Sequence, residues 1–173
     1  MQPFAKLIGH DKSVEDVIFR PDSDHELCSV GVDRKILFWD TRAKGQNSSQ
    51  SGHAPNEIPT VSSLRQQKIQ EHGPVNKLLN VHMDDINTVD WSRINLNLIA
   101  TGSNNKKVCV IDIRKLSTHS LDVASLTLPE QNSLSPVINT FEGHTEPILS
   151  VRFCPFDGRF LLSSAESVKI WDM

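Results

Sequence analysis

Three residues in the N-terminal part of the chain, His10, Ser29 and Asp33, have the side chains of a hydrolytic triad. In such a triad the serine hydroxyl is the nucleophile, the imidazole takes its proton and the carboxylate orients the imidazole. The sequence has no glycine-flanked nucleophile elbow, no metal-ligating cluster and no glycine-rich phosphate loop beside them. Hydrolysis is therefore one hypothesis, and the surrounding pattern has to decide whether these residues catalyse or support a fold.

The histidine belongs to a spacing that occurs three times along the chain. His10 precedes Trp39 by 29 residues, His82 precedes Ile111 by 29, and His144 precedes Trp171 by 27. In every copy an aspartate follows directly. Self-similarity at a nearly constant distance is the signature of a repeat protein. The sequence therefore predicts three repeats, over residues 9–42, 81–114 and 143–173, within one partial domain that spans residues 1–173.

Apolar residues recur at the same places of each copy, four, seven and nine positions after the histidine. They are Val14, Val17 and Phe19, then Ile86, Val89 and Trp91, then Ile148, Val151 and Phe153. The last two positions differ by two, which is the period of a β-strand. Second strands are predicted at ELCSVG, LIATGS and FLLSSA, and third strands at KILFWD, KVCVID and VKIWD. The segment that leads into each histidine is expected to supply a fourth strand.

Four strands per unit, with Gly-His near one end and Trp-Asp near the other, resemble the WD-repeat family, whose units are the blades of a β-propeller. The resemblance covers most of the chain. It implies an all-β fold with three four-stranded blades. Because propellers have about four to eight blades, three blades form an incomplete, open propeller. The chain is accordingly expected to be part of a longer protein or a truncated product that needs a partner.

The resemblance also implies a structural role for the triad-like residues. Blades of this family carry a buried hydrogen-bonded chain of tryptophan, serine or threonine, histidine and aspartate. The matching residues are His10, Ser29, Asp33 and Trp39 in the first repeat, His82 and Thr101 in the second, and His144, Ser163 and Trp171 in the third. In the second repeat Ile111 and Asn105 replace the tryptophan and the aspartate. A protein without catalytic activity is expected.

Two segments lengthen the distance between repeats beyond the roughly 40–45 residues of one WD unit. Residues 43–73 are rich in Ser, Gln, Asn and Gly, and residues 115–135 are similarly polar. Both lie between the third strand of one unit and the strand that leads into the next histidine. We expect both to be polar insert loops.

The composition excludes several classes of function. The chain has a net charge of −3 and its basic residues are scattered, so direct binding of nucleic acid is not expected. No stretch has the length of a membrane span, and the N-terminus lacks the apolar core of a signal peptide. Cys28, Cys109 and Cys154 lack the spacing of a zinc site. We expect no cofactor, metal or small-molecule substrate.

Within the WD-repeat family, the stretches VEDVIFRP, FWDTR, IRKL, FEGH and SSAE look like the MSI and retinoblastoma-binding branch of histone-binding proteins, its plant members above all. The resemblance implies an interaction scaffold that partners histones and other subunits of chromatin-assembly and chromatin-modifying complexes. It implies location in the nucleus, with the cytoplasm as a second location. Glu15, the glutamate of VEDV, would belong to an acidic pocket for a basic histone tail.

The ending Trp39-Asp40-Thr41-Arg42 supports a different hypothesis. It resembles the docking box by which some WD-repeat proteins bind the adaptor of cullin-type ubiquitin ligases. Arg42 would contact that adaptor, and Arg114 holds the matching place in the second repeat. The chain would then be a substrate receptor. A third alternative is a truncated product without an independent function.

Overall fold

The computed structural model describes residues 5–42, 70–116, 121–122 and 135–173. The first repeat folds into three antiparallel strands, β2 (Val14–Phe19), β3 (Glu26–Gly31) and β4 (Lys35–Asp40). Strand β6 (Asn76–Leu79) pairs antiparallel with β4, and β10 (Leu121–Asp122) pairs parallel with β6. The strand order of this first sheet is β10-β6-β4-β3-β2.

The second and third repeats also form three consecutive antiparallel strands. The second sheet contains β7 (Ile86–Trp91), β8 (Leu98–Ser103), β9 (Lys107–Asp112) and β11 (Val137–Glu142), in the order β11-β9-β8-β7. The third contains β12 (Ser150–Phe153), β13 (Phe160–Ser164) and β14 (Val168–Asp172). A short 3-10 helix, η2 (Ile113–Lys115), follows β9. Strands β1 (Ala5–Leu7) and β5 (Gln70–His72) form a separate parallel pair.

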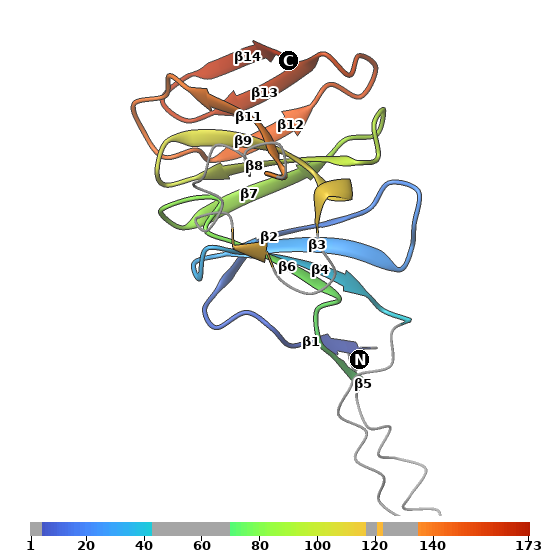
Figure 1. Ribbon diagram of the computed structural model, residues 1–173. Helices are drawn as coiled ribbons and strands as arrows, with labels where there is room; N and C mark the ends of the chain where they lie inside the picture. The colour runs from blue at the N-terminus through green and yellow to red at the C-terminus, as the bar shows by residue number, and fades with distance from the viewer. Residues whose placement is uncertain (1–4, 43–69, 117–120, 123–134) are drawn as a thin grey trace, which may run out of the picture.

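The sheets stack one after another like the blades of a propeller that does not close (Figure 1). The predicted all-β, open WD-repeat propeller is confirmed. One detail differs from the prediction, because the strands before His82 and His144 pair with the preceding sheet: β6 with β4 and β11 with β9. Among the described residues the third sheet consequently has three strands.

Two short strands lie inside the segments for which loops were expected. Strand β5 falls within residues 43–73, and β10 falls within residues 115–135. The remainder of the two inserts lies largely outside the described residues. The backbone pairing of β10 with β6 gives the first sheet its fifth strand.

The hairpin turns after β3 and β8 share one local design. Arg34 and Lys106 have positive φ angles of 63° and 68°, in the left-handed region that tight hairpins require. The residue before each of them, Asp33 or Asn105, accepts a hydrogen bond from the backbone N–H two residues after it, at 3.2 Å in both turns. The same two side chains are thereby placed to face the histidines.

The core is formed between sheets because side chains of a strand alternate between its two faces. Between the first and second sheets, Cys28, Val30, Ile36 and Phe38 are buried in one cluster with Ile86, Val89, Trp91, Ile99 and Ile111. Between the second and third, Ala100, Val108 and Val110 are buried with Ile148, Val151, Phe153 and Leu161. The second sheet is therefore apolar on both faces.

Two carboxylates form hydrogen bonds between the first strands of neighbouring sheets. Asp16 Oδ2 accepts hydrogen bonds from the Val89 N–H and the Thr88 hydroxyl, both at 3.0 Å. Asp90 Oδ2 accepts one from the Phe153 N–H at 2.7 Å. Burial raises the pKa of Asp90, although the Phe153 N–H opposes that rise. The described part of the chain has no helix long and apolar enough to cross a membrane.

Candidate functional site

The first repeat contains a continuous hydrogen-bonded network. His10 Nδ1 lies 2.9 Å from Asp33 Oδ1, and His10 Nε2 lies 2.8 Å from the Ser29 hydroxyl. Trp39 Nε1 donates to the same hydroxyl at 2.8 Å. Burial opposes ionisation of Asp33, yet hydrogen bonds from the Asp11 N–H and from His10 outweigh burial and lower its pKa. An ionised Asp33 keeps the Nδ1 proton on His10.

This geometry shares the His, Ser and Asp contacts of a triad but differs in the state of the nucleophile. The Ser29 side chain is bonded both to His10 and to the Trp39 indole, and Ser29 is only 5% exposed. A hydroxyl that bonds two fixed partners is held in place and stabilises the blade. The arrangement favours support of the fold over attack on a substrate.

The second network contains neutral groups. His82 Nδ1 lies 3.2 Å from Asn105 Oδ1, and Nε2 lies 2.9 Å from the Thr101 hydroxyl. His82 is 1% exposed. Burial lowers the pKa of His82 to about 4, while the hydrogen bond to Asn105 opposes this change. His82 is therefore uncharged at neutral pH.

The third network uses a residue to which the sequence analysis assigned no role. His144 Nε2 lies 2.6 Å from the Ser163 hydroxyl, which also accepts from Trp171 Nε1 at 2.8 Å. Glu166 Oε2 lies 3.1 Å from His144 Nδ1. Desolvation opposes ionisation, but hydrogen bonds from backbone N–H groups and from His144 lower the pKa of Glu166 to about 2. The side chain of glutamate is one methylene longer than that of aspartate, which compensates for a turn two residues shorter than in the first repeat. An acidic residue in this shortened turn was the sequence feature that could have identified Glu166.

Glu15 lies at a β-bulge. The register of β2 against β3 shifts between Val14 and Asp16, and that of β7 against β8 shifts between Ile86 and Thr88, so Glu15 and Asn87 are matching extra residues. A bulge re-aims the side chain of the residue it adds. Glu15 is exposed, and no described side chain forms a hydrogen bond with its carboxylate.

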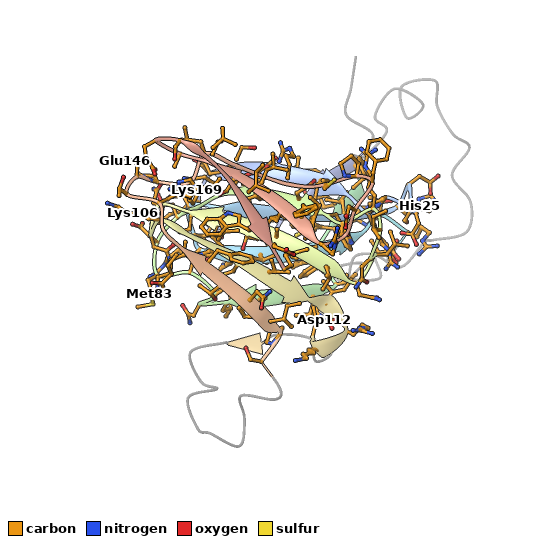
Figure 2. The ribbon with its side chains drawn as sticks, turned by 90° about the horizontal axis from the view of Figure 1, so that it is seen from above. His25, Met83, Lys106, Asp112, Glu146 and Lys169 are labelled. Carbon is orange, nitrogen blue, oxygen red and sulfur yellow. The ribbon has the colours of Figure 1, made fainter. Side chains whose placement is uncertain are left out.

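Exposed acidic residues gather in the turns near that bulge. They are Asp11, Asp84 and Glu146, each one or two positions after the histidine of its repeat. In Figure 2, Glu146, Lys106 and Met83 lie at one end of the sheets, whereas His25 and Asp112 lie at the other. We call the end with the histidine turns the histidine rim.

The arginines two residues after Asp40 and Asp112 lie at the opposite end. Arg42 Nε and Nη2 donate to the two carboxylate oxygens of Asp40 at 3.0 and 2.9 Å. Arg114 forms the same fork with Asp112 at 3.0 and 2.7 Å. These hydrogen bonds lower the pKa of both aspartates. The arginine side chains are 59% and 65% exposed, so each guanidinium is oriented but open to solvent.

Sequence analysis missed a third fork of this kind. Arg159 Nε and Nη2 bond Asp157 at 3.2 and 2.9 Å, and the side chain of Arg159 is 67% exposed. The Met173 N–H donates to the Arg159 carbonyl, as the residues after Asp40 and Asp112 donate to the matching carbonyls of their own sheets. The fork therefore lies at the same end of the sheets as Arg42. Its Asp-x-Arg spacing was the sequence feature that could have predicted it.

Two of the three cysteines are placed as apolar core residues, and Cys154 is only partly buried. Cys28 and Cys109 are buried, which raises the pKa of both thiols, to about 11 for Cys109. Within the described ranges, no group of three or more His, Cys, Asp or Glu side chains could hold a metal ion.

Comparisons with known proteins match the first and third repeats to a known family. The family description "WD domain, G-beta repeat" matches residues 1–40 and 135–172. The chain is 33% identical over 136 residues to the WD-40 repeat-containing protein MSI4 of Arabidopsis thaliana, an alignment that covers 79% of this chain and 19% of the relative. It is 29% identical over 171 residues to histone acetyltransferase type B subunit 2 of Debaryomyces hansenii, covering 98% of this chain and 32% of the relative.

A third relative has a different printed role. The chain is 24% identical over 161 residues to the EARP and GARP complex-interacting protein 1 of Rattus norvegicus, covering 86% of this chain and 34% of the relative. The chain thus spans about a third or less of the length of the curated relatives it matches. The repeats, the stacked sheets and these matches together establish that the chain belongs to the WD-repeat family of β-propeller proteins and is similar to its MSI-type members.

Proposed function

We propose that this chain belongs to a non-catalytic scaffold of the chromatin machinery, which works in the nucleus and binds a basic histone tail at the histidine rim. The observation that carries the proposal is the exposed carboxylate of Glu15, which lies on a bulge beside other acidic turns and has no partner among the described side chains. Two relatives support the chromatin context, since one is named as an MSI protein and one as a histone acetyltransferase subunit.

The chemistry of the rim suits a tail rich in lysine and arginine. Carboxylates accept charge-assisted hydrogen bonds from these cations, and acidic residues around the contact speed the encounter with a basic partner. Asp11 already pairs with Lys35, whereas Glu15 has no partner among the described side chains. Glu15 is therefore a residue at which a tail can gain a new ion pair.

The test is binding of a synthetic histone-tail peptide, followed by fluorescence anisotropy at several salt concentrations. An exposed ion pair contributes about 1 kcal/mol, so Glu15→Gln is expected to weaken binding roughly fivefold. Asp24→Asn is the matched control, because Asp24 is 87% exposed in the turn between β2 and β3, at the other end of the sheet. Equal affinity of wild type and Glu15→Gln would remove Glu15 from the site.

A second candidate function is docking to the adaptor of a cullin-type ubiquitin ligase. The observation in its favour is the fork in which Asp40 fixes Arg42 while leaving the guanidinium 59% exposed. Arg42→Ala should abolish co-purification of the adaptor, and Arg114→Ala should reduce it. Lys12→Ala, an exposed cation at the histidine rim, is the control. Full retention of the adaptor by Arg42→Ala would exclude this function.

A further inference from the structure

A groove crosses the contact between the first and second sheets at the end opposite the histidine rim. One part, of about 700 Å³, lies between the turn that follows β2 and the turn that follows β7. A second part, of about 270 Å³, lies between the end of β4 and η2, and Figure 1 shows η2 at the end of the sheets where β4 ends. Arg20 and Trp91 line both parts. We call the two parts together the inter-sheet groove.

Apolar side chains of both sheets form the walls of the inter-sheet groove. Pro21 and Val75 come from the first sheet, and Leu96 and Leu116 from the second. The Trp91 indole forms the floor, because Trp91 is 3% exposed and its Nε1 already donates to the Leu96 carbonyl at 2.8 Å. A mainly apolar groove with a few placed polar groups is the usual form of a binding site.

The charged residues that line the inter-sheet groove are Arg20, Asp22, Glu26, Asp40 and Arg93. Four of the five are paired within the chain. Arg20 donates to Asp22 at 2.7 Å and to Glu26 at 2.9 Å, while Asp40 accepts from Arg42. Arg93 is exposed and forms no hydrogen bond or ion pair among the described residues. The described lining of the groove therefore contains one uncompensated charge, and it is positive.

The turn between β7 and β8 fixes the position of Arg93. The Ser92 hydroxyl accepts a hydrogen bond from the Asn95 N–H at 3.0 Å, so the backbone around Arg93 is held in place. The Asp90 carboxylate interacts with the charge of Arg93 only at a distance, and it already accepts a hydrogen bond from the Phe153 N–H. The donors of the Arg93 guanidinium are consequently open to a carboxylate from outside the chain.

We propose that the inter-sheet groove binds a short acidic and apolar peptide segment of a partner protein. A carboxylate of the segment pairs with Arg93, and a neighbouring apolar side chain covers Trp91 and Leu96. A guanidinium binds a carboxylate through two parallel hydrogen bonds, and the apolar contact adds free energy by removing surface from water. This partner is opposite in charge to a histone tail, and the inference rests neither on tail binding nor on adaptor docking.

The experiment selects peptides from a random-peptide phage library on the full 173-residue chain. Wild type, Arg93→Gln and Arg159→Gln are used in parallel, and the sequences enriched on each are compared. Arg159→Gln is the matched control, because it removes an exposed guanidinium at the same end that does not line the groove. Peptides that carry Asp or Glu beside Leu, Ile, Val or Phe should be enriched on wild type and Arg159→Gln but not on Arg93→Gln.

The affinity of the most enriched acidic peptide is then measured by fluorescence anisotropy. Loss of one exposed ion pair in Arg93→Gln should weaken binding roughly fivefold, and Arg93→Lys, which keeps the charge, should weaken it less. Arg93 has no partner among the described side chains, so these changes leave the fold intact.

Three results would overturn the proposal. One is the absence of acidic and apolar peptides that prefer wild type to Arg93→Gln, which is expected if a segment of this chain or of a longer chain covers the groove. Another is equal affinity of wild type and Arg93→Gln for the selected peptide. The third is an equal loss of affinity in Arg159→Gln, which would show attraction to the general charge of this end instead of binding in the groove.

Discussion

The neutral histidine of the second network makes the stability of the chain depend on pH in a calculable way. His82 has a pKa of about 4 in the folded chain because it is buried, against about 6.5 in an unfolded chain. Between these values the unfolded chain binds more protons, so the free energy of unfolding falls as pH falls through this window. The loss reaches about 3 kcal/mol below both pKa values and about 2 kcal/mol at about pH 5.

The assay compares wild type with His82→Gln by urea unfolding, monitored through tryptophan fluorescence at about pH 7.5 and about pH 5. Glutamine keeps a side-chain amide near Thr101 but does not titrate. Other titrating groups, such as Asp90 and Glu166, are common to both proteins and cancel in the difference. Wild type should lose about 2 kcal/mol more than the variant between the two pH values. Equal losses would refute the conclusion that His82 is buried in its neutral form.

Three substitutions test the packing between sheets and within the first network. Gly102→Ala would place a Cβ 2.4 Å from Ile148 Cγ2, so the free energy of urea unfolding should fall by about 1–3 kcal/mol. Gly73→Ala is the control: a Cβ added there has nothing within 4 Å, and the change should cost less than about 1 kcal/mol. Asp90→Ala removes the acceptor of a backbone N–H on the third sheet and should cost about 1–3 kcal/mol, while Asp90→Asn keeps an acceptor and should cost less. Trp39→Phe removes the indole donor and should lower the unfolding free energy by about 1 kcal/mol without changing the far-ultraviolet circular dichroism; a changed spectrum would show that the indole determines the fold itself.

The sequence was sufficient to predict the strands and the three histidines because both leave a local, repeated pattern. Each histidine precedes its serine or threonine by 19 residues in all three copies. The pairing of β6 with β4 could not be predicted in this way, because 35 residues separate Asp40 from Asn76 and periodicity does not record long-range partners.

The same limit applied to the polar contacts between sheets. Asp16 and Asp90 accept hydrogen bonds from backbone N–H groups more than 60 residues away in the sequence. The two aspartates also stand at different distances from the histidines of their own repeats. Glu166 escaped prediction because its turn is shorter than the others, which hid its correspondence with Asp33. A pattern defined by constant spacing misses a partner that a longer side chain brings into place.

Because the strands that lead into His82 and His144 pair with the preceding sheet, the sequence repeat and the folded sheet are out of phase. A fragment that ends at Asp112 would lose the outer strand of the second sheet, and one that ends at Asp40 would lose both β6 and β10 from the first. A fragment that ends after Glu142 would keep the second sheet whole, and one that ends after Leu79 would keep β6 and lose only β10. Proteolytic cleavage that preserves folded pieces, and any shortened version made for expression, should therefore cut directly before a histidine turn and not after a Trp-Asp pair.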